Sequence, residues 1–361
     1  MRVIVTAGGT GGHIYPALAI VQKIREMEPD SEVLYIGTHN RMEKDIVPKS
    51  GIPYEPIEIY GLSTSIKLMP RNVKNVFLIN KAYHKCLKIM KEFRPDVVIG
   101  VGGYVTYPVI KAAHKSGVKT FIHEQNSIPG KANKVLLKYT DLVGVSFKDS
   151  VKYFSNSRVV VTGNPCSENA LKTPKSDKCD YGRSRNKPGI LIFNGSLGSE
   201  AMNKKMLEFL EDISDEVYEV LYITGKNYYR QFKNKKFSKN VKVVPYVDNL
   251  SGLMKDMDLI VSRAGASSVA EITALALPCI LIPSPYVANN HQYYNAQSIV
   301  KANAGVMIEE KDLNKDTLKE SIDKILKDQD YRKTMQKNLK ALSIDNSATL
   351  IYNELKKLIS K

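Results

Sequence analysis

Short apolar runs alternate with longer amphipathic runs along nearly the whole chain. The short runs are rich in Val, Ile and Leu, as strands are when both faces of a parallel sheet are covered. The longer runs have the length and amphipathic character of helices. Strands are expected at residues 2–6, 32–37, 96–101, 119–124 and 158–163, and then at 189–195, 217–225, 241–247, 258–263 and 278–283. The alternation predicts an α/β fold of parallel sheets with helices on both faces.

The pattern breaks once, between about Asn164 and Pro188, where the chain is polar, charged and punctuated by prolines. Such a composition is typical of a linker. We therefore predict two doubly wound, Rossmann-like domains, residues 1–162 and 163–340. A last helix is expected over 346–360, with the first domain as its candidate packing partner.

Composition narrows the class of partner. The 361 residues are 43% hydrophobic, enough for two cores, and the formal net charge of +16 favours an anionic partner. Nucleic acid, a phosphate-rich substrate and a membrane surface all qualify, but a nucleic-acid partner is disfavoured because the chain has no RNA- or DNA-binding motif and no tryptophan. The four cysteines are far apart, which argues for a reducing compartment and against a zinc site. No run approaches the ~18 apolar residues of a spanning helix, so the expected location is cytosolic, with contact to a membrane still open.

Glycine-rich turns follow several of the expected strands. In an open parallel sheet, ligands bind beyond the carboxyl ends of the strands, and helix N-termini there offer free N–H groups to phosphate oxygens. The turns are 8-GGTGGH-13, 102-GGYVTYP-108, 195-GSLGS-199 and 263-RAGASSVAE-271. The first fits neither the dinucleotide fingerprint GxGxxG nor the Walker loop, because Ile14 stands where the third glycine is needed and no Gly-Lys-Ser/Thr is present.

The turn at 263–271 supports two interpretations. Ser267, Ser268 and the helix amides suit a diphosphate, and Glu271 is spaced to accept hydrogen bonds from a ribose diol. Ser268 and Glu271 also have the spacing of an ordinary capping box, which spacing alone slightly favours. Asp256 and Asp258 form a DxD pattern ahead of a strand, and for them we expect a structural role.

Taken together, these stretches resemble the MurG family of glycosyltransferases. The resemblance rests on an ordered set: 7-AGGTGGHIYPALAI-20, 102-GGYVTYPV-109, 123-HEQNSIPGKANK-134, 163-GNP-165, 195-GSLG-198, 262-SRAGASSVAEI-272 and 289-NNHQYYNA-296. It implies a GT-B fold, in which two Rossmann-like domains face a cleft. It also implies an inverting transfer of N-acetylglucosamine from UDP-GlcNAc to the 4-hydroxyl of lipid I, the muramoyl-pentapeptide on undecaprenyl diphosphate, giving lipid II. No metal or other cofactor is implied.

The resemblance also implies a set of site residues. The first domain would take the acceptor and the second the donor. Donor contacts are expected from Thr10, Gly11, Gly12, Asn126, Ser196, Val247, Ala266, Ser267, Ser268, Val269, Ala270, Glu271 and Gln292. Acceptor contacts are expected from Gly8, Gly9, Gly102, Gly103 and Tyr104. Ser167 stands where the family commonly has an arginine near the donor.

The transfer needs a base for the acceptor hydroxyl, and two residues are candidates. His13 ends the first glycine loop, and its alternative role is to shape that loop through a hydrogen bond to a backbone carbonyl. Glu124, at the end of another strand, is the competing base, whereas His123 beside it is expected to be structural. UDP-N-acetylglucosamine 2-epimerases share the architecture and the donor, and remain the alternative enzyme class.

The segment 66–94 is the expected docking site for the cytoplasmic face of an anionic membrane, which would make the protein peripheral. It carries eight basic residues against one acid, Glu92. At 100° per residue, the expected core stripe is Val76, Ile79, Tyr83, Cys86, Leu87 and Met90. The opposite face is expected to hold Lys74, Lys81, Lys85 and Lys88, with Leu78 among them, Phe77 at the border, and Leu68 and Met69 extending the apolar patch.

Overall fold

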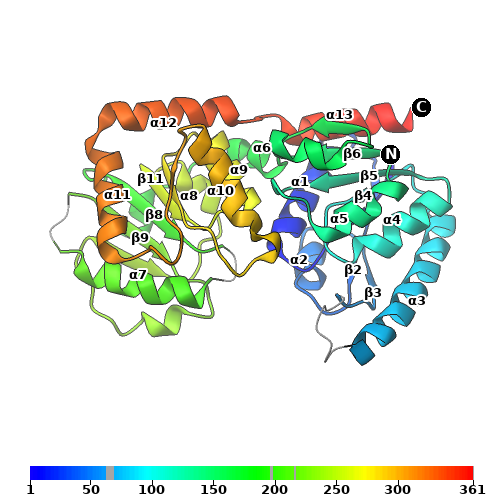
Figure 1. The fold of residues 1–361 in the computed structure, drawn as a ribbon, viewed down its shortest axis with the longest axis horizontal. Helices are drawn as coiled ribbons and strands as arrows, with labels where there is room; N and C mark the ends of the chain where they lie inside the picture. The colour runs from blue at the N-terminus through cyan, green and yellow to red at the C-terminus, as the bar shows by residue number, and fades with distance from the viewer. Residues whose placement is uncertain (62–68, 196–197, 215–216, 361) are drawn as a thin grey trace. The chain divides into compact units, whose positions relative to one another are not determined.

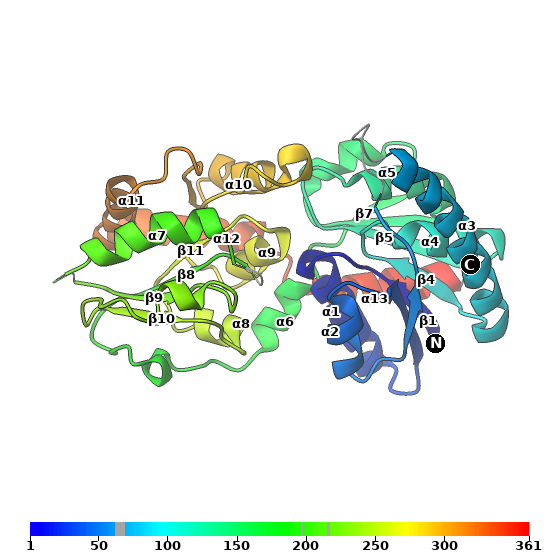
Figure 2. The ribbon, with the colours of Figure 1, turned by 90° about the horizontal axis from the view of Figure 1, so that it is seen from below.

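The computed structural model describes residues 1–61, 69–195, 198–214 and 217–360, which form two compact units (Figures 1 and 2). Unit 1 comprises Met1–Cys166 together with Asn346–Lys361, and unit 2 comprises Ser167–Asp345. Each unit is a parallel sheet with helices on both faces. Among the described residues, no helix is both long and apolar enough to cross a bilayer.

The sheet of unit 1 has seven strands in the order β3-β2-β1-β4-β5-β6-β7. The central strand β1 pairs with β2 on one side and β4 on the other, with Val3 opposite both Val33 and Val97. The strands are β1 (Arg2–Thr6), β2 (Glu32–Thr38), β3 (Tyr54–Ile57), β4 (Val97–Gly100), β5 (Lys119–Glu124), β6 (Leu142–Val145) and β7 (Val159–Val161). Their side chains are buried on both faces of the middle strands, as the apolar runs predict.

The helices of unit 1 cover the sheet from two sides. On one face, α1 packs against α13, and the core there takes Ile14, Ile24, Ile351 and Leu355. On the other face, α3 lies beside α4 (Figure 1). The helices are α1 (Gly11–Met27), α2 (Glu43–Lys49), α3 (Met69–Phe93), α4 (Thr106–Lys115), α5 (Lys131–Leu136) and α13 (Ser347–Ile359), with 3₁₀ turns η2 (Leu137–Tyr139) and η3 (Lys148–Phe154).

A partly exposed carboxylate ties α13 to the end of α1. Glu28 accepts hydrogen bonds from the Tyr352 hydroxyl at 2.8 Å, the Lys356 ammonium at 2.7 Å and the Met1 amino group at 2.9 Å. The Lys356 and Met1 hydrogen bonds lower the pKa of Glu28 from 4.5 to about 2. The C-terminal helix is therefore an integral part of unit 1.

The sheet of unit 2 has six strands in the order β10-β9-β8-β11-β12-β13. The strands are β8 (Gly189–Phe193), β9 (Glu219–Ile223), β10 (Val241–Val244), β11 (Leu259–Ser262), β12 (Cys279–Leu281) and β13 (Val306–Met307). The helices are α7 (Glu200–Asp212), α8 (Leu250–Met254), α9 (Ala266–Ala274), α10 (His291–Lys301), α11 (Lys315–Lys327) and α12 (Gln329–Leu342). Short 3₁₀ turns are η4 (Lys178–Tyr181), η5 (Tyr229–Gln231) and η6 (Ala288–Asn290), and α6 (Cys166–Lys172) begins at the boundary between the units.

Both sheets reverse their strand order at one point, between β1 and β4 in unit 1 and between β8 and β11 in unit 2. In doubly wound folds, ligands bind beyond the carboxyl ends of the strands at such a reversal. The glycine-rich turns of the sequence follow these four strands. Each unit therefore presents a candidate site at its own reversal.

The polar stretch before Pro188 is fastened to unit 2. The Lys178 amide donates to Asp256 at 2.8 Å, and the Asn249 side chain donates to the Pro174 carbonyl at 3.2 Å. Asp258 accepts from the Gly189 amide at 2.8 Å. Both carboxylates of the DxD pattern thus anchor the backbone, in agreement with the structural role expected for them.

The burial of α3 corrects the expected stripe at two positions. Leu78 is buried, only 5% exposed, although the helical wheel put it among the lysines; Val76 is 60% exposed, although the wheel put it in the core. Phe77 beside it is 69% exposed, and Lys74, Lys81, Lys85 and Lys88 are exposed as predicted. Leu68 and the side chain of Met69 lie outside the described residues. The exposed apolar pair is therefore Val76 and Phe77, next to Lys74.

Candidate functional site

The loops after β1 and β4 are interlocked at the strand reversal of unit 1. The Gly8 amide donates to the Gly102 carbonyl at 3.2 Å. A side chain at Gly103 would place its Cβ 2.4 Å from the Gly8 carbonyl oxygen, and Gly103 has φ +89°, so this close approach requires glycine. The structure thus brings together four of the five predicted acceptor residues, Gly8, Gly9, Gly102 and Gly103. Tyr104 follows them, and its buried hydroxyl has no hydrogen-bond partner among the described residues.

The N-terminus of α1 presents unpaired donors beside these loops. Thr10 is the N-cap residue but its side chain makes no capping hydrogen bond, and the first turn carries no acid. The His13 and Ile14 amides donate to the Thr10 carbonyl, while the amides of Thr10, Gly11 and Gly12 find no acceptor among the described residues. Three free N–H groups at the start of a 17-residue helix suit an anion.

His13 is oriented by a backbone carbonyl. Its Nδ1 lies 3.0 Å from the Gly8 carbonyl oxygen, which only accepts, so Nδ1 carries the proton in the neutral ring. Nε2 then has a lone pair and no hydrogen-bond partner among the described residues. The ring lies against Gly102, where any Cβ would come within 2.6 Å of it. Both expected roles of His13 are thus compatible, because the contact that shapes the loop also leaves Nε2 as a base.

Glu124, the competing base, is surrounded by donors. Its Oε1 accepts from the Asn126 amide at 2.9 Å and from the Asn126 side chain at 3.3 Å. Its Oε2 accepts from the Gly130 amide at 3.0 Å and from the Asn133 side chain at 2.8 Å. The carboxylate is only 2% exposed. These contacts order the loop that carries Asn126.

His123 belongs to the strand end itself. Its Nε2 donates to the Gly163 carbonyl at 2.9 Å and its Nδ1 accepts from the Gln125 side chain at 3.0 Å. Complete burial lowers its pKa to about 4, so the ring stays neutral. The same Gln125 amide group reaches the Val101 carbonyl at 3.0 Å, linking β5 to the loop after β4.

Glu43 is a site residue that sequence reasoning missed. It starts α2, is fully buried, and accepts from the Gly9 amide at 3.1 Å, the Thr38 amide at 3.2 Å and the Thr38 hydroxyl at 2.6 Å. A Cβ on Gly8 would come within 2.4 Å of the Glu43 carboxylate. In the sequence, Glu43 is only an acidic residue at the start of a helix, five residues after a strand ends. That pattern is too common to mark Glu43 as a site residue.

In unit 2, the helix α9 begins directly after the loop that follows β11. Its N-cap is Gly265, with no side-chain capping bond, so the capping box expected from the spacing of Ser268 and Glu271 is wrong. The amides of Ala266, Ser267 and Ser268 have no acceptor among the described residues, and the buried Ser267 hydroxyl also lacks a partner there. These donors all belong to the first turn of α9, where free N–H groups suit the oxygens of a diphosphate. The Val269 side chain packs inward and Ala270 lies partly exposed on the helix.

Glu271 is half-buried on the second turn of α9, and its carboxyl group has no hydrogen-bond or ion-pair partner in the part of the chain that the structure describes. Burial raises its pKa from 4.5 to about 7. A carboxyl group that is shielded from water and has no partner is costly to the fold when it is charged, and such groups are concentrated at ligand-binding and catalytic sites.

Arg263 holds the loops around this site together, a role that the sequence did not indicate. Its guanidinium donates to the Ser199 hydroxyl at 3.0 Å and to the carbonyls of Ile282 and Pro283 at 3.2 and 3.3 Å. It also pairs with the Glu310 carboxylate, and both side chains are less than 10% exposed. The ends of β8, β11, β12 and β13 are therefore joined by one side chain.

The remaining predicted donor residues are placed as follows. Gln292 lies in the first turn of α10 and its Oε1 accepts from the Ser284 amide at 2.9 Å. Val247 is buried in the loop after β10. Ser196 lies outside the described residues. The Ser167 hydroxyl donates to the Ile344 carbonyl at 2.9 Å.

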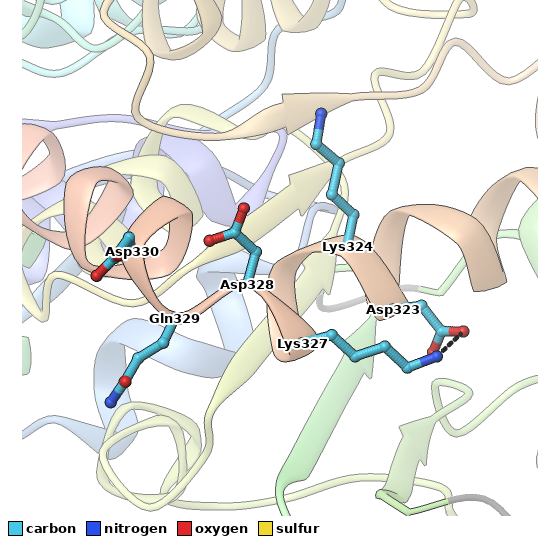
Figure 3. Close-up of a pocket in the computed structure, with 6 residues that line it drawn as sticks. All are labelled: Asp323, Lys324, Lys327, Asp328, Gln329 and Asp330. Atoms are coloured by element: carbon cyan, nitrogen blue, oxygen red, sulfur yellow. Dashed lines mark hydrogen bonds and ion pairs between the residues drawn. The ribbon is translucent and has the colours of Figure 1, made fainter.

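The surface also carries a shallow hollow of about 510 Å³ where α11 meets α12 (Figure 3). Its lining is charged, and Lys327 pairs with Asp323 at 2.9 Å. None of the predicted site residues lines it. Within the described ranges, His, Cys, Asp and Glu side chains form no cluster of three suited to a metal ion.

Two sequence profiles match the chain: the glycosyltransferase family 28 N-terminal domain over residues 3–145 and the family 28 C-terminal domain over residues 189–351. The chain is 44% identical, over the whole of both chains, to a Bacillus cereus protein named UDP-N-acetylglucosamine--N-acetylmuramyl-(pentapeptide) pyrophosphoryl-undecaprenol N-acetylglucosamine transferase 1. In fold it is similar to Acinetobacter baumannii MurG, with a TM-score of 0.78, 24% identity and 99% of each chain covered. It is also similar in fold to a putative UDP-N-acetylglucosamine 2-epimerase from Listeria monocytogenes, with a TM-score of 0.71 at 14% identity, covering 98% and 95% of the two chains.

Proposed function

The chain belongs to glycosyltransferase family 28, and from that premise we propose that it transfers N-acetylglucosamine from UDP-GlcNAc to lipid I, forming lipid II. The observation that carries this proposal is the 44% identity over the full length of a relative named for that transfer. The two parallel sheets are consistent with this proposal, because they form a GT-B architecture similar to that of MurG. The 2-epimerases share the fold at 14% identity, which concerns architecture only.

We place the donor at the strand reversal of unit 2. The free amides at the start of α9 and the unpaired Ser267 hydroxyl hold the donor diphosphate, and Glu271 accepts hydrogen bonds from the ribose diol. Val247 and Gln292 complete the donor contacts, and Arg263 positions the loops between them. The helix dipole and the N–H groups also stabilise the negative charge that develops on UDP as it leaves.

We place the acceptor at the strand reversal of unit 1. The loops at Gly8–Gly9 and Gly102–Tyr104 hold the acceptor diphosphate. Thr10, Gly11, Gly12 and Asn126 are assigned to the donor sugar. Nε2 of His13 accepts the proton of the 4-hydroxyl as its oxygen bonds to the anomeric carbon. The bond from that carbon to the diphosphate oxygen breaks, UDP leaves with the electron pair, and the configuration inverts.

Glu124 has a positioning role in this scheme. Four hydrogen-bond donors already satisfy its two oxygens, so proton abstraction by Glu124 would first have to break the loop contacts. His13→Ala is therefore expected to lower kcat by about 10²–10⁴ with donor affinity unchanged. Glu124→Gln is expected to raise KM, because the loop that carries Asn126 loses its order. If His13→Ala kept its activity and Glu124→Gln lost it, Glu124 would be the base and His13 the positioning residue.

Unit 1 is proposed to dock on an anionic membrane through α3. Val76 and Phe77 are exposed beside Lys74, and Lys81 and Lys88 continue the basic face. Each lysine near an anionic leaflet contributes about 1 kcal/mol at moderate salt. Docking brings the lipid-linked acceptor within reach of the loops while its tail stays in the bilayer.

Liposome co-sedimentation tests the docking surface. The triple change Lys74→Glu/Lys81→Glu/Lys88→Glu is expected to abolish binding to anionic vesicles at low salt, and Phe77→Ser to weaken it at any salt. A matched control, Lys204→Glu/Lys233→Glu/Lys236→Glu, makes the same charge change at exposed lysines of unit 2. Equal loss of binding in the control would show a net-charge effect and place the docking surface elsewhere.

The activity itself is tested by UDP release from UDP-GlcNAc with and without a short-chain lipid I analogue. Release that depends on the acceptor, with a disaccharide product, is the expected result. Conversion of UDP-GlcNAc to its manno epimer without acceptor, observed by proton NMR, would support the epimerase alternative and contradict the transfer.

A further inference from the structure

We propose that Glu43 acts on His13 through the peptide group between Gly8 and Gly9, forming a carboxylate–peptide–imidazole relay that strengthens the base. The inference rests on the proposed role of His13. Three groups are aligned in series: the Glu43 carboxylate, one peptide unit and the His13 ring. Glu43 touches no substrate in this proposal, so its role is to position and polarise.

The peptide unit has a hydrogen bond at each end. Its N–H, on Gly9, donates to Glu43 Oε2 at 3.1 Å, and its C=O, on Gly8, accepts from His13 Nδ1 at 3.0 Å. Drawing the N–H toward a carboxylate shifts electron density onto the carbonyl oxygen, because the peptide bond is conjugated. The carbonyl then becomes a better acceptor for the imidazole N–H, which favours a protonated ring. Nε2 of His13 therefore gains basicity.

The Glu43 carboxylate is fixed in place by burial and by hydrogen bonds. Glu43 is fully buried, and the amide and hydroxyl of Thr38 donate to its other oxygen at 3.2 and 2.6 Å. Each of its contacts comes from a donor, so the group accepts throughout, as an ionised carboxylate does. A hydrogen bond made away from water also polarises its neighbours more strongly than an exposed one.

The loop geometry keeps the relay in register. Gly9 has φ +92°, which turns its N–H toward α2, and Gly8 leaves no room for a side chain above the carboxylate. The Tyr35 hydroxyl donates to the Ala7 carbonyl at 2.9 Å, and the Tyr54 hydroxyl donates to the Thr38 carbonyl at 2.6 Å. The loop is thus fixed on both sides of the relay.

Among the described residues, several other titratable groups lie around the relay, and none of them is hydrogen-bonded to its peptide unit. Burial first, and the Glu43 charge next, raise the pKa of both Tyr35 and Tyr54, so these phenols stay neutral. Lys44, Asp45 and Arg41 are exposed around the start of α2, where solvent screens them. His39, at the end of β2, is the second imidazole at this edge, and its Nε2 lies 3.2 Å from the Tyr60 hydroxyl.

The test is an NMR titration of His13 in Glu43→Gln. The glutamine can keep its oxygen toward Thr38 but turns an NH₂ group toward the Gly9 amide, so the first link of the relay is lost. The His13 pKa is expected to fall by about half a unit to one unit, a three- to tenfold loss of proton affinity. The signal is assigned by its disappearance in His13→Gln, which separates it from His39. Asp45→Asn is the matched control, since it removes an exposed carboxylate two residues further along the same helix.

An unchanged His13 pKa in Glu43→Gln, or an equal fall in Asp45→Asn, would overturn the relay. The wild-type protein supplies a second measurement if Glu43→Gln does not fold. With [¹⁵N]glycine labelling, the Gly9 amide proton is expected to move downfield as His13 is protonated, with the same midpoint. A Gly9 signal that stays flat through that titration would equally refute the relay.

Kinetics separate the relay from the proposed function. The acid limb of the kcat/KM profile is expected to shift with the His13 pKa, while UDP binding stays unchanged. A pKa that falls without any shift of the acid limb would leave the relay standing and exclude His13 as the base.

Discussion

Glu271 gives the sharpest prediction, because its proposed contact with the donor ribose calls for the charged carboxylate, whereas burial favours the neutral acid. Its pKa in the folded protein is about 7, raised from 4.5 by burial. A ribose diol donates two hydrogen bonds, which an ionised carboxylate accepts better than a neutral acid. Donor binding therefore selects the ionised form. The affinity for UDP-GlcNAc is expected to fall as the pH drops below 7.

The size of the effect follows from the populated fraction. With a pKa of about 7, the ionised fraction is roughly 0.9 at pH 8 and roughly 0.1 at pH 6, so the apparent Kd rises about tenfold between them. UDP-GlcNAc suits the assay because both of its phosphates are esterified and do not titrate in this range. Calorimetry at pH 6, 7 and 8 measures the change. Glu271→Gln should bind more weakly at pH 8 and show no pH dependence.

The same shift makes a prediction for stability. A carboxyl whose folded pKa is raised is favourable to the fold below pH 4.5, and that contribution is lost as the pH rises through 7. The full span is about 3 kcal/mol. Without donor at pH 8, Glu271→Gln should therefore be more stable than wild type in thermal unfolding. A less stable variant, or a wild-type Kd that is flat from pH 6 to pH 8, would refute the assignment of Glu271 to the donor.

Three further predictions concern the scaffold. Glu28→Gln should lose about 1 kcal/mol of stability at pH 7, because solvent screens this partly exposed group. Wild-type stability should fall as the pH drops from 4.5 toward 2, because the Lys356 and Met1 hydrogen bonds lower the pKa of Glu28; chemical unfolding against pH measures both effects. Gly103→Ala forces a Cβ against the Gly8 carbonyl and should destabilise unit 1 by about 1–3 kcal/mol while UDP binding persists, so normal transfer would show that the loops are not interlocked. Arg263→Met leaves Glu310 buried and unpaired, which should destabilise unit 2 by about 3–5 kcal/mol and weaken UDP binding. The double variant Arg263→Met/Glu310→Met should recover much of the lost stability, because it leaves no unpaired charge.

Most of the strands could be predicted from the sequence, because each is marked by an apolar run of neighbouring residues. β1, β5 and β8 are continuous apolar runs with a glycine loop or polar end, and their expected positions match the structure to within a few residues. β3, β6 and β13 were missed. β3 is only four residues with a proline, β6 is four with a glycine, and β13 is two residues long, so none carries enough pattern to stand out.

The helix α3 shows where periodicity alone fails. A wheel of 100° per residue ranks positions only by their angle, whereas burial depends on which residues the neighbouring elements cover. Leu78 is 5% exposed and Val76 is 60% exposed, the reverse of their places on the wheel. The wheel therefore assigned the wrong burial to two residues that are only two positions apart in the sequence.

The sequence by itself determined the parallel α/β architecture, the glycine turns at the strand ends and, through its ordered stretches, the glycosyltransferase family. These features depend on residues close together along the chain: an apolar run, a turn that needs positive φ, a helix start. The tertiary structure decided which charged and polar groups have partners. Glu124 is saturated by donors up to nine residues away, Glu43 meets a glycine 34 positions before it, and Glu271 meets no partner among the described residues. Such pairings join groups brought together by folding, and pKa and chemical role follow from the pairing rather than from the residue type.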